Sequence, residues 1–232
     1  MSNWQRLVWD QRDAFAAGFQ VTVEVCAASF LFALIGGLLL ALVRLYVRPL
    51  RTVALVLTEF FRATPILVQL LWVNYVWPEL IGWPNSFFAA ACVALALQSS
   101  GYLAETFRGG IESMPRGQAE AASSLGMSRT RAFLRIVLPQ VLLDAAPSIG
   151  NQFTVIVKSS ALVSVIAVPD LMFQSQKLVN RWYEPIEILT ATAVIYIGFI
   201  FAMSALLNAM AHALRRRFGV GTASTPSSRL EM

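Results

Sequence analysis

The residues of this chain that could do chemistry are polar side chains set within long apolar stretches. They are Glu59, Arg62, Gln98, Glu105, Asn151, Lys158 and Ser159. Groups of both charge signs, with amides and a hydroxyl, suit a zwitterion, whose ammonium and carboxylate need partners of opposite sign. No loop of the G-x-x-x-x-G-K-[ST] type appears, so we expect the chain to bind no ATP and to carry no catalytic residue.

Helical spacing places these polar residues on three stripes. The first holds Glu59, Arg62, Ile66 and Gln69, the second Gln98, Tyr102 and Glu105, and the third Asn151, Val155, Lys158, Ser159 and Leu162. Residues three, four or seven apart share a helix face. An isolated charge at the centre of a bilayer costs roughly 2.5–3.5 kcal/mol on insertion scales. Exposing any of these stripes to lipid would therefore cost free energy, so we expect the three stripes to face one another inside the protein.

Two roles are open for several of these residues. Glu59 and Arg62 lie three positions apart, so they could form a structural ion pair, contact a solute, or do both. Lys158 could contact a solute, act as a gate or pack between helices. Glu105 lies near the end of its apolar segment and could simply be a solvated charge. A neutral sugar would call for stacked aromatic side chains, and a metal for a cluster of His, Cys and carboxylates; the sequence shows neither arrangement.

The composition is that of a membrane protein. The chain has 232 residues, 57% hydrophobic and 13% charged, with a mean hydropathy of +0.63, which is too apolar for an ordinary soluble domain. Cys26 and Cys92 both fall in apolar runs, so we expect neither a disulfide framework nor a metal site. A net charge of +5 could suggest nucleic acid, but the basic residues sit in short loops beside apolar segments, which indicates topology instead.

Apolar segments long enough to cross a membrane predict an all-α fold with five transmembrane helices. They are residues 25–43, about 53–76, 87–103, a stretch within 145–168, and 188–211. Pro65, directly after Thr64, predicts a kink in the second. We expect residues 1–17 to form an external amphipathic segment, residues 18–217 the transmembrane domain, and residues 218–232 a disordered cytoplasmic tail.

Basic residues predict the orientation of these helices. Twelve would lie on the side of the loop 105–140: Arg44, Arg48, Arg51, Arg108, Arg116, Arg129, Arg131, Arg135, Arg215, Arg216, Arg217 and Arg229. Four would lie on the other side: Arg6, Arg12, Lys177 and Arg181. The positive-inside rule therefore favours a cytoplasmic loop and an external N-terminus.

The loop 105–140 is the longest polar interruption of the chain. Residues 118–125 are rich in Ala, Glu and Leu, which favour a short helix. Gly126 predicts a left-handed stop, and Ser128 is a plausible N-cap for a second helix. A helix this short is not stable alone in water, so we expect it to bind a partner.

The same loop carries a family resemblance. E-A-A, three residues, Gly, nine residues and I-x-L-P resemble the cytoplasmic EAA loop of ATP-binding-cassette (ABC) importer permeases. The matching positions are Glu120, Ala121, Ala122, Gly126, Ile136, Leu138 and Pro139. Three further segments resemble motifs of permeases for polar amino acids: Glu59–Gln69 (EFFRATPILVQ), Gly101–Gln118 (GYLAETFRGGIESMPRGQ) and Asn151–Leu162 (NQFTVIVKSSAL). The likeness covers about residues 18–217.

The resemblance implies a permease subunit of a type I ABC importer in a bacterial inner membrane. In such importers two permease subunits, alike or unlike, enclose the pathway. An external solute-binding protein delivers the solute, and a cytoplasmic ATPase dimer, which binds the ATP and Mg²⁺, docks the loop helix as a coupling helix. The implied solute is a polar amino acid or a close analogue such as an opine.

The chain departs from the family pattern at two positions. Many relatives carry an acidic residue or Asn where this chain has Ser159, and Ser or Thr where it has Ala161. Ser159 cannot pair with a cationic side chain, which weakens the case for arginine or lysine as the solute, although Glu59 remains. A partner permease could supply the missing group.

Two other classes of protein stay open from the sequence. A secondary transporter or channel driven by an ion gradient would use Glu59, Arg62 and Lys158 as a relay. It would leave the loop helix unexplained, and five spans without an internal repeat are unusual for it. A receptor that only docks a binding protein would have no use for charged stripes inside the membrane. Copurification of a stoichiometric ATPase separates the importer from both.

Overall fold

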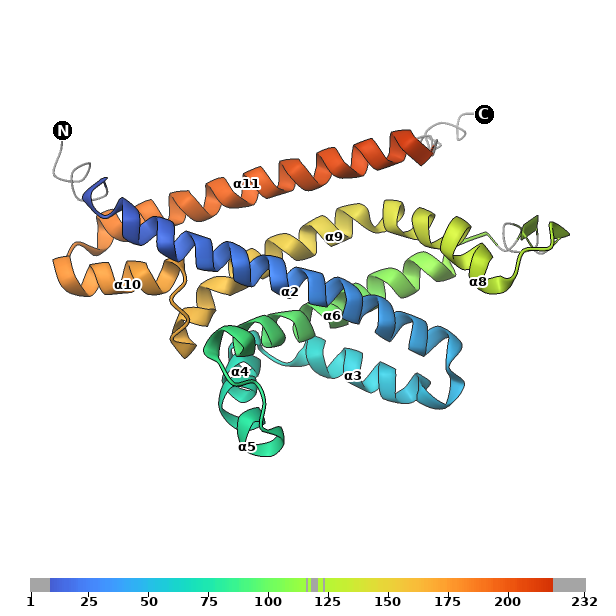
Figure 1. Ribbon diagram of the computed structural model, residues 1–232, viewed down its shortest axis with the longest axis horizontal. Helices are drawn as coiled ribbons and strands as arrows, with labels where there is room; N and C mark the ends of the chain where they lie inside the picture. The colour runs from blue at the N-terminus through green and yellow to red at the C-terminus, as the bar shows by residue number, and fades with distance from the viewer. Residues whose placement is uncertain (1–8, 116, 118–120, 123, 219–232) are drawn as a thin grey trace, which may run out of the picture.

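The computed structural model describes residues 9–218 except 116, 118–120 and 123, and these described residues form helices joined by short turns, with no strand among them. Figure 1 shows the arrangement. The elements are α2 (Arg12–Tyr46), a 3-10 turn (Arg48–Leu50), α3 (Arg51–Ala63), α4 (Ile66–Leu71), a π-helical turn (Trp72–Val76), α5 (Trp77–Ile81), α6 (Phe87–Glu112), α8 (Arg129–Ala132), a second π-helical turn (Phe133–Val137), α9 (Leu138–Ser160), a 3-10 segment (Ala161–Ile166), α10 (Leu171–Trp182) and α11 (Pro185–Phe218).

Within the described residues, four helices are long and apolar enough to cross a membrane. They are Arg12–Tyr46, Phe87–Glu112, the continuous run Arg129–Ile166, and Pro185–Ala213. A fifth span is obtained if Arg48–Ala63 and Ile66–Ile81 are counted together, although they are bent by 109°. The prediction of an all-helical membrane protein is confirmed. The first of these helices begins at Arg12, so residues 12–17 continue the helix of the first span.

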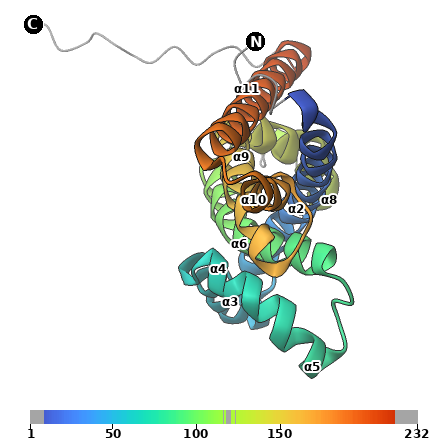
Figure 2. The same ribbon diagram turned by 90° about the vertical axis from the view of Figure 1, so that its left-hand side faces the viewer.

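The second predicted span is broken, where the sequence predicted a kink. α3 ends at Thr64, whose backbone is extended at φ −76° and ψ 128°, and α4 starts directly after Pro65. Proline has no N–H to continue the helix, and its ring forces the preceding residue out of the helical region. Viewed from the α10 end, α3, α4 and α5 lie to one side of the other helices (Figure 2). The chain therefore changes direction between Arg62 and Ile66.

α6 is the central helix of the fold. Its apolar window is 61% buried, against 22–33% for the other three candidate spans. Two consecutive serines bind different neighbours: Ser99 Oγ accepts a hydrogen bond from Gln152 Nε2 of α9 at 3.0 Å, and Ser100 Oγ donates to the Ala33 carbonyl of α2 at 3.4 Å. One turn of α6 thus fixes the positions of two other helices.

Glycines allow α6 to approach α2 and α3 closely. A Cβ added at Gly37 of α2 would lie 2.7 Å from Leu103 Cβ, and one added at Gly101 would lie 2.9 Å from Arg62 Cγ and 3.0 Å from the Thr58 carbonyl oxygen. Small residues are favoured where membrane helices cross for this reason. Gly101 matters most for function, because it lets the stem of Arg62 lie directly on α6.

Candidate functional site

The candidate site forms where α3 ends and packs on α6. Arg62 Nη1 donates to Glu59 Oε1 at 3.0 Å, and the two side chains remain 34% and 56% exposed. The guanidinium carbon of Arg62 lies 5.4 Å from the centre of the Tyr102 ring, a cation–π arrangement. The Tyr102 hydroxyl also donates to the Arg62 carbonyl at 3.4 Å. The structural ion pair that the sequence left as one of the possible roles is therefore present, and both of its side chains remain partly accessible.

The break at Pro65 exposes a carbonyl that α6 then binds. Gln98 Nε2 donates to the Thr64 carbonyl oxygen at 3.4 Å. In an unbroken helix this oxygen would accept from the backbone N–H four residues on. The structure therefore brings together the first two predicted stripes, at Glu59 and Arg62 on one side and Gln98 and Tyr102 on the other.

This arrangement can bind both ends of a zwitterion. Arg62 offers a planar set of donors that matches a carboxylate, and its side chain is 34% exposed, although its Nε is buried without a hydrogen-bond partner among the described residues. Glu59 can accept from an ammonium group. The Tyr102 ring holds the guanidinium in place, and the Gly101 backbone leaves room for its stem.

Glu105 belongs to a different cluster, although it shares a face of α6 with Gln98 and Tyr102. One of its carboxylate oxygens pairs with Arg44 of α2, and the other accepts from Arg108 Nη2 at 2.8 Å and Nε at 2.9 Å. Arg108 also pairs with Glu112. We call these four residues the Glu105 cluster. Both oxygens of Glu105 are occupied, so it is not a freely solvated charge.

The third stripe stays apart from the first two in a single chain. Asn151 and Lys158 of α9 are exposed and Ser159 is half-buried. Within the described part of the chain, no side-chain hydrogen bond or ion pair involves Lys158 or Asn151. The neighbouring Gln152 is buried and bonded to Ser99. The predicted convergence therefore holds for two stripes, while the third presents its polar groups outward.

The loop has the predicted local structure where it is described. Gly126 has φ +74°, and the Met127 N–H donates to the Ala122 carbonyl at 3.0 Å, the six-residue bond of a Schellman stop. Ser128 caps α8 by accepting from the Arg131 N–H at 3.4 Å. Glu120 lies outside the described residues. Ala121 is exposed and Ala122 is buried.

The end of the EAA pattern lies in continuous helix. Ile136 belongs to the π-helical turn Phe133–Val137, and Leu138 and Pro139 begin α9; all three are half-buried. Proline is tolerated in the first turn of a helix, where its missing N–H is not needed. Arg129, Arg131 and Arg135 are all exposed beside them. A short turn at residues 126–128 therefore joins the loop to the continuous helix Arg129–Ile166, which carries Lys158.

Sequence reasoning missed four contributors to these two sites. Tyr102 was placed on a stripe but given no role, and Gly101 was read only as part of a motif. Arg44 and Arg108 were counted only for topology. The spacing of Glu105, Arg108 and Glu112 by three and four residues could have indicated local ion pairs. Nothing in the sequence pattern points to the pairing with Arg44.

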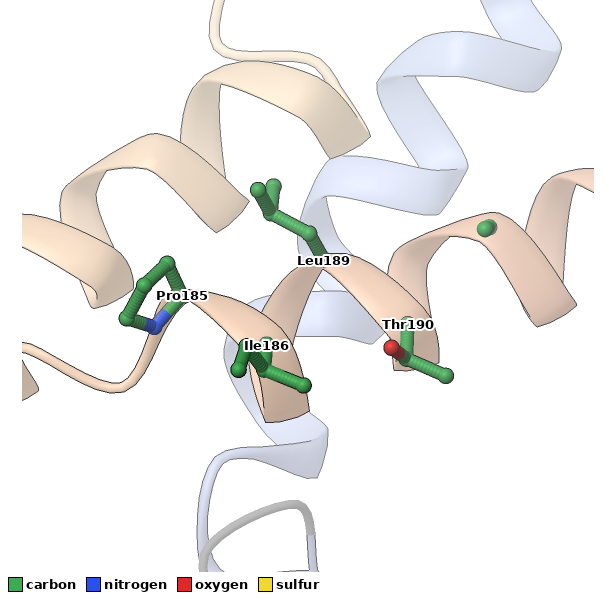
Figure 3. Close-up of a pocket in the computed structure, with 5 residues that line it drawn as sticks. Pro185, Ile186, Leu189 and Thr190 are labelled. Carbon is green, nitrogen blue, oxygen red and sulfur yellow. The ribbon is translucent and has the colours of Figure 1, made fainter.

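A separate surface hollow lies away from these residues. It measures about 470 Å³ and is lined by Pro185, Ile186, Leu189, Thr190 and Ala193, all from the first turns of α11 (Figure 3). Its lining holds no charged group. A solute site needs a few convergent polar groups among its apolar walls, so we do not assign the solute to this hollow.

Comparison with known proteins gives the family. Residues 33–220 match the family described as binding-protein-dependent transport system inner membrane component. The chain is 38% identical to the L-cystine transport system permease protein TcyL of Bacillus subtilis (strain 168) over 197 residues, 82% of each chain. It is 32% identical to the arginine transport system permease protein ArtQ of the same organism over 199 residues, 85% of this chain and 91% of ArtQ.

The fold is similar to that of a solved transporter. The crystal structure of an amino acid ABC transporter with histidines superposes with a TM-score of 0.80 at 33% identity, covering 92% of this chain and 99% of that chain. The chain belongs to the family of inner membrane components of binding-protein-dependent transport systems.

Proposed function

We propose that this chain is the permease subunit of an ATP-driven importer for polar amino acids, or for a close analogue such as an opine. The observation that carries the proposal is the pair Glu59–Arg62. The pair places a positive and a negative side chain next to the break between α3 and α4. Arg62 lies over the Tyr102 ring, and both charged side chains are partly exposed. The names of the relatives, which refer to cystine, arginine and amino acid transport, support the same class of solute.

A second permease subunit covers the exposed polar side chains of α3 and α9. Glu59 of α3 is 56% exposed, and Asn151 and Lys158 of α9 are exposed in the single chain. A charge facing lipid near mid-span costs roughly 2.5–3.5 kcal/mol. A second copy or an unlike permease, enclosing a water-lined pathway with this one, removes that cost. Gln98, Lys158 and Ser159 then line the pathway with Glu59 and Arg62.

Energy comes from a cytoplasmic ABC ATPase dimer, which binds ATP and Mg²⁺; this chain binds neither. The loop helix that ends at Gly126 docks in a groove of the ATPase, with Glu120, Ala121 and Ala122 at the contact. Because the chain from Arg129 to Ile166 is one continuous helix, movement of the docked loop is transmitted directly to Lys158. The helices then alternate between inward and outward access.

The topology follows from the same assignment. The loop is cytoplasmic and the N-terminus external, with the bent pair α3–α4 counted as the second of five spans. The protein lies in a bacterial inner membrane, and an external solute-binding protein delivers the solute. Because Ser159 offers no negative charge, we favour a zwitterionic solute without a cationic side chain.

The test is uptake by a reconstituted complex with its ATPase and binding protein, offered polar amino acids, neutral sugars and divalent metals in turn. Only amino acids or their analogues should be accumulated. Arg62→Gln should lower the initial uptake rate by about tenfold or more, because a charged hydrogen bond contributes about 1.5–3 kcal/mol. Arg51→Gln is the matched control, since Arg51 lies exposed on the same helix. Uptake of sugar or metal, with amino acids inert, would contradict the solute class.

A further inference from the structure

α10 lies at the opposite end of the molecule from α8 and the coupling loop (Figure 1). It packs on α2 and α11. If the coupling loop is cytoplasmic, as the proposed function requires, α10 is on the external side. It is therefore placed to meet whatever approaches the permease from outside.

α10 is fixed to the membrane helices by buried polar bonds. Asp170, which is fully buried, caps the helix by accepting from the Phe173 N–H at 2.9 Å. The Leu171 N–H donates to Thr22 Oγ of α2 at 3.0 Å. Ser175 Oγ lies 2.6 Å from Thr192 Oγ of α11. A buried hydrogen bond is costly to leave unmade, so α10 is held in one position and moves with α2 and α11.

The outward face of α10 carries two cations. Lys177 and Arg181 are four positions apart and both exposed. Lys177 Nζ lies 5.8 Å from the centre of the Phe173 ring, and the Arg181 guanidinium carbon lies 5.5 Å from that of Trp182. Like charges at this spacing repel each other, and the rings hold them in place.

Neither cation has an acidic partner within the described residues. The ion pairs found there involve other residues. Glu184 precedes α11 and Glu187 lies in its first turn, yet neither pairs with Lys177 or Arg181. Two exposed cations on one helix face, without an acidic partner among the described residues, are complementary to a negatively charged surface.

We propose that the outward face of α10, with Lys177 and Arg181 at its centre, binds an acidic patch on the solute-binding protein. The inference rests on the proposed function and names the docking surface of that partner. A helix that binds a membrane surface presents its apolar face to lipid. The apolar face of α10, with Leu171 and Leu178, is buried inside the protein, which favours a protein partner over lipid headgroups.

The experiment measures docking in the complete complex, reconstituted in nanodiscs with its ATPase and titrated with the binding protein. The readout is the concentration of binding protein that gives half-maximal stimulation of ATP hydrolysis. The double variant Lys177→Glu, Arg181→Glu should raise that concentration about tenfold or more, because like charges then face each other. Basal ATP hydrolysis should not change. In the charge-conserving control Lys177→Arg, Arg181→Lys, the concentration should stay at the wild-type value.

Salt and lipid separate the alternatives. Wild-type docking should weaken as salt rises, and the charge-reversed variant should lose that dependence. If the binding protein stimulates ATP hydrolysis in the wild type and the charge-reversed variant has the same half-maximal concentration, this inference is overturned and the proposed function is not. A variant whose only defect is a lost response to anionic lipid in the nanodisc would have the same consequence. If the binding protein does not stimulate ATP hydrolysis by the wild-type complex, both the proposed function and this inference are overturned.

Discussion

Two groups of charged residues lie on neighbouring helices, one on α3 and the other on α2 and α6. Glu59 and Arg62 form one ion pair on one helix, half-exposed and open to further partners. The Glu105 cluster joins α2 to α6, and its arginines are only 17% and 27% exposed. Residue types and helical spacing are alike in the two groups. What differs is the number of partners each carboxylate already has, which is why we propose a solute site at Glu59 and Arg62 and a structural role for the Glu105 cluster.

The largest effect on stability is expected in the Glu105 cluster. Glu105→Gln removes the charge that Arg44 and Arg108 share, leaving two partly buried guanidinium groups close together. We expect the free energy of unfolding to fall by about 1–3 kcal/mol, measured as a lower thermal midpoint in detergent. Glu112→Gln is the matched control, since Glu112 is 50% exposed, and it should change stability by less than about 0.5 kcal/mol. Equal stability of both variants would show that the cluster is not structural.

Asp170 extends the comparison to a buried carboxylate with no cation beside it. Burial raises its pKa from 3.8 to about 6. Hydrogen bonds from backbone N–H groups and from Tyr196 lower the pKa, but by less than burial raises it. The folded state therefore binds this proton more readily than the unfolded state, and stability falls as pH rises through about 4 to 6. Lowering the pH from 7.5 to 5 should stabilise the fold by about 1 kcal/mol through this group.

Asp170→Asn isolates that contribution. The variant has no carboxyl to titrate, so its thermal midpoint should respond less to pH between 7.5 and 5 than that of the wild type. Parallel pH profiles for the two proteins would show that Asp170 is not the titrating group.

The smallest effect on stability is expected at Glu59. Exposed ion pairs contribute about 0.2–1 kcal/mol, and Glu59 is 56% exposed. Glu59→Gln should therefore lower the free energy of unfolding by less than about 0.5 kcal/mol, measured beside Glu105→Gln under the same conditions. A loss as large as that of Glu105→Gln would remove the distinction between the two groups.

The sequence predicted features whose causes are local. Gly126 adopts the left-handed conformation and Ser128 caps the next helix, because both depend on a few neighbouring residues. The pairing of Glu59 with Arg62 is local in the same way. The family motif then supplied the importer assignment, and the family match leaves the ion-gradient alternative without support.

Features that depend on packing between distant segments were not predicted. Arg44 and Glu105 are 61 positions apart, and no periodicity within one helix relates them. Pro65 indicated where the second span changes direction, but the angle of 109° is set by how α3 and α4 pack on α6. The contact of Gly101 with Arg62 likewise requires knowing that α3 crosses α6 at that turn.

The most direct test of the account is the initial rate of amino acid uptake by Glu59→Gln in the reconstituted complex. The variant loses the charge that faces an ammonium group while keeping the fold, so uptake should drop by about tenfold or more with an almost unchanged thermal midpoint. Glu112→Gln, a carboxylate of similar exposure outside the proposed pathway, should transport at the wild-type rate. Wild-type uptake by a correctly inserted Glu59→Gln protein would contradict the assignment of Glu59 and Arg62 as the solute site.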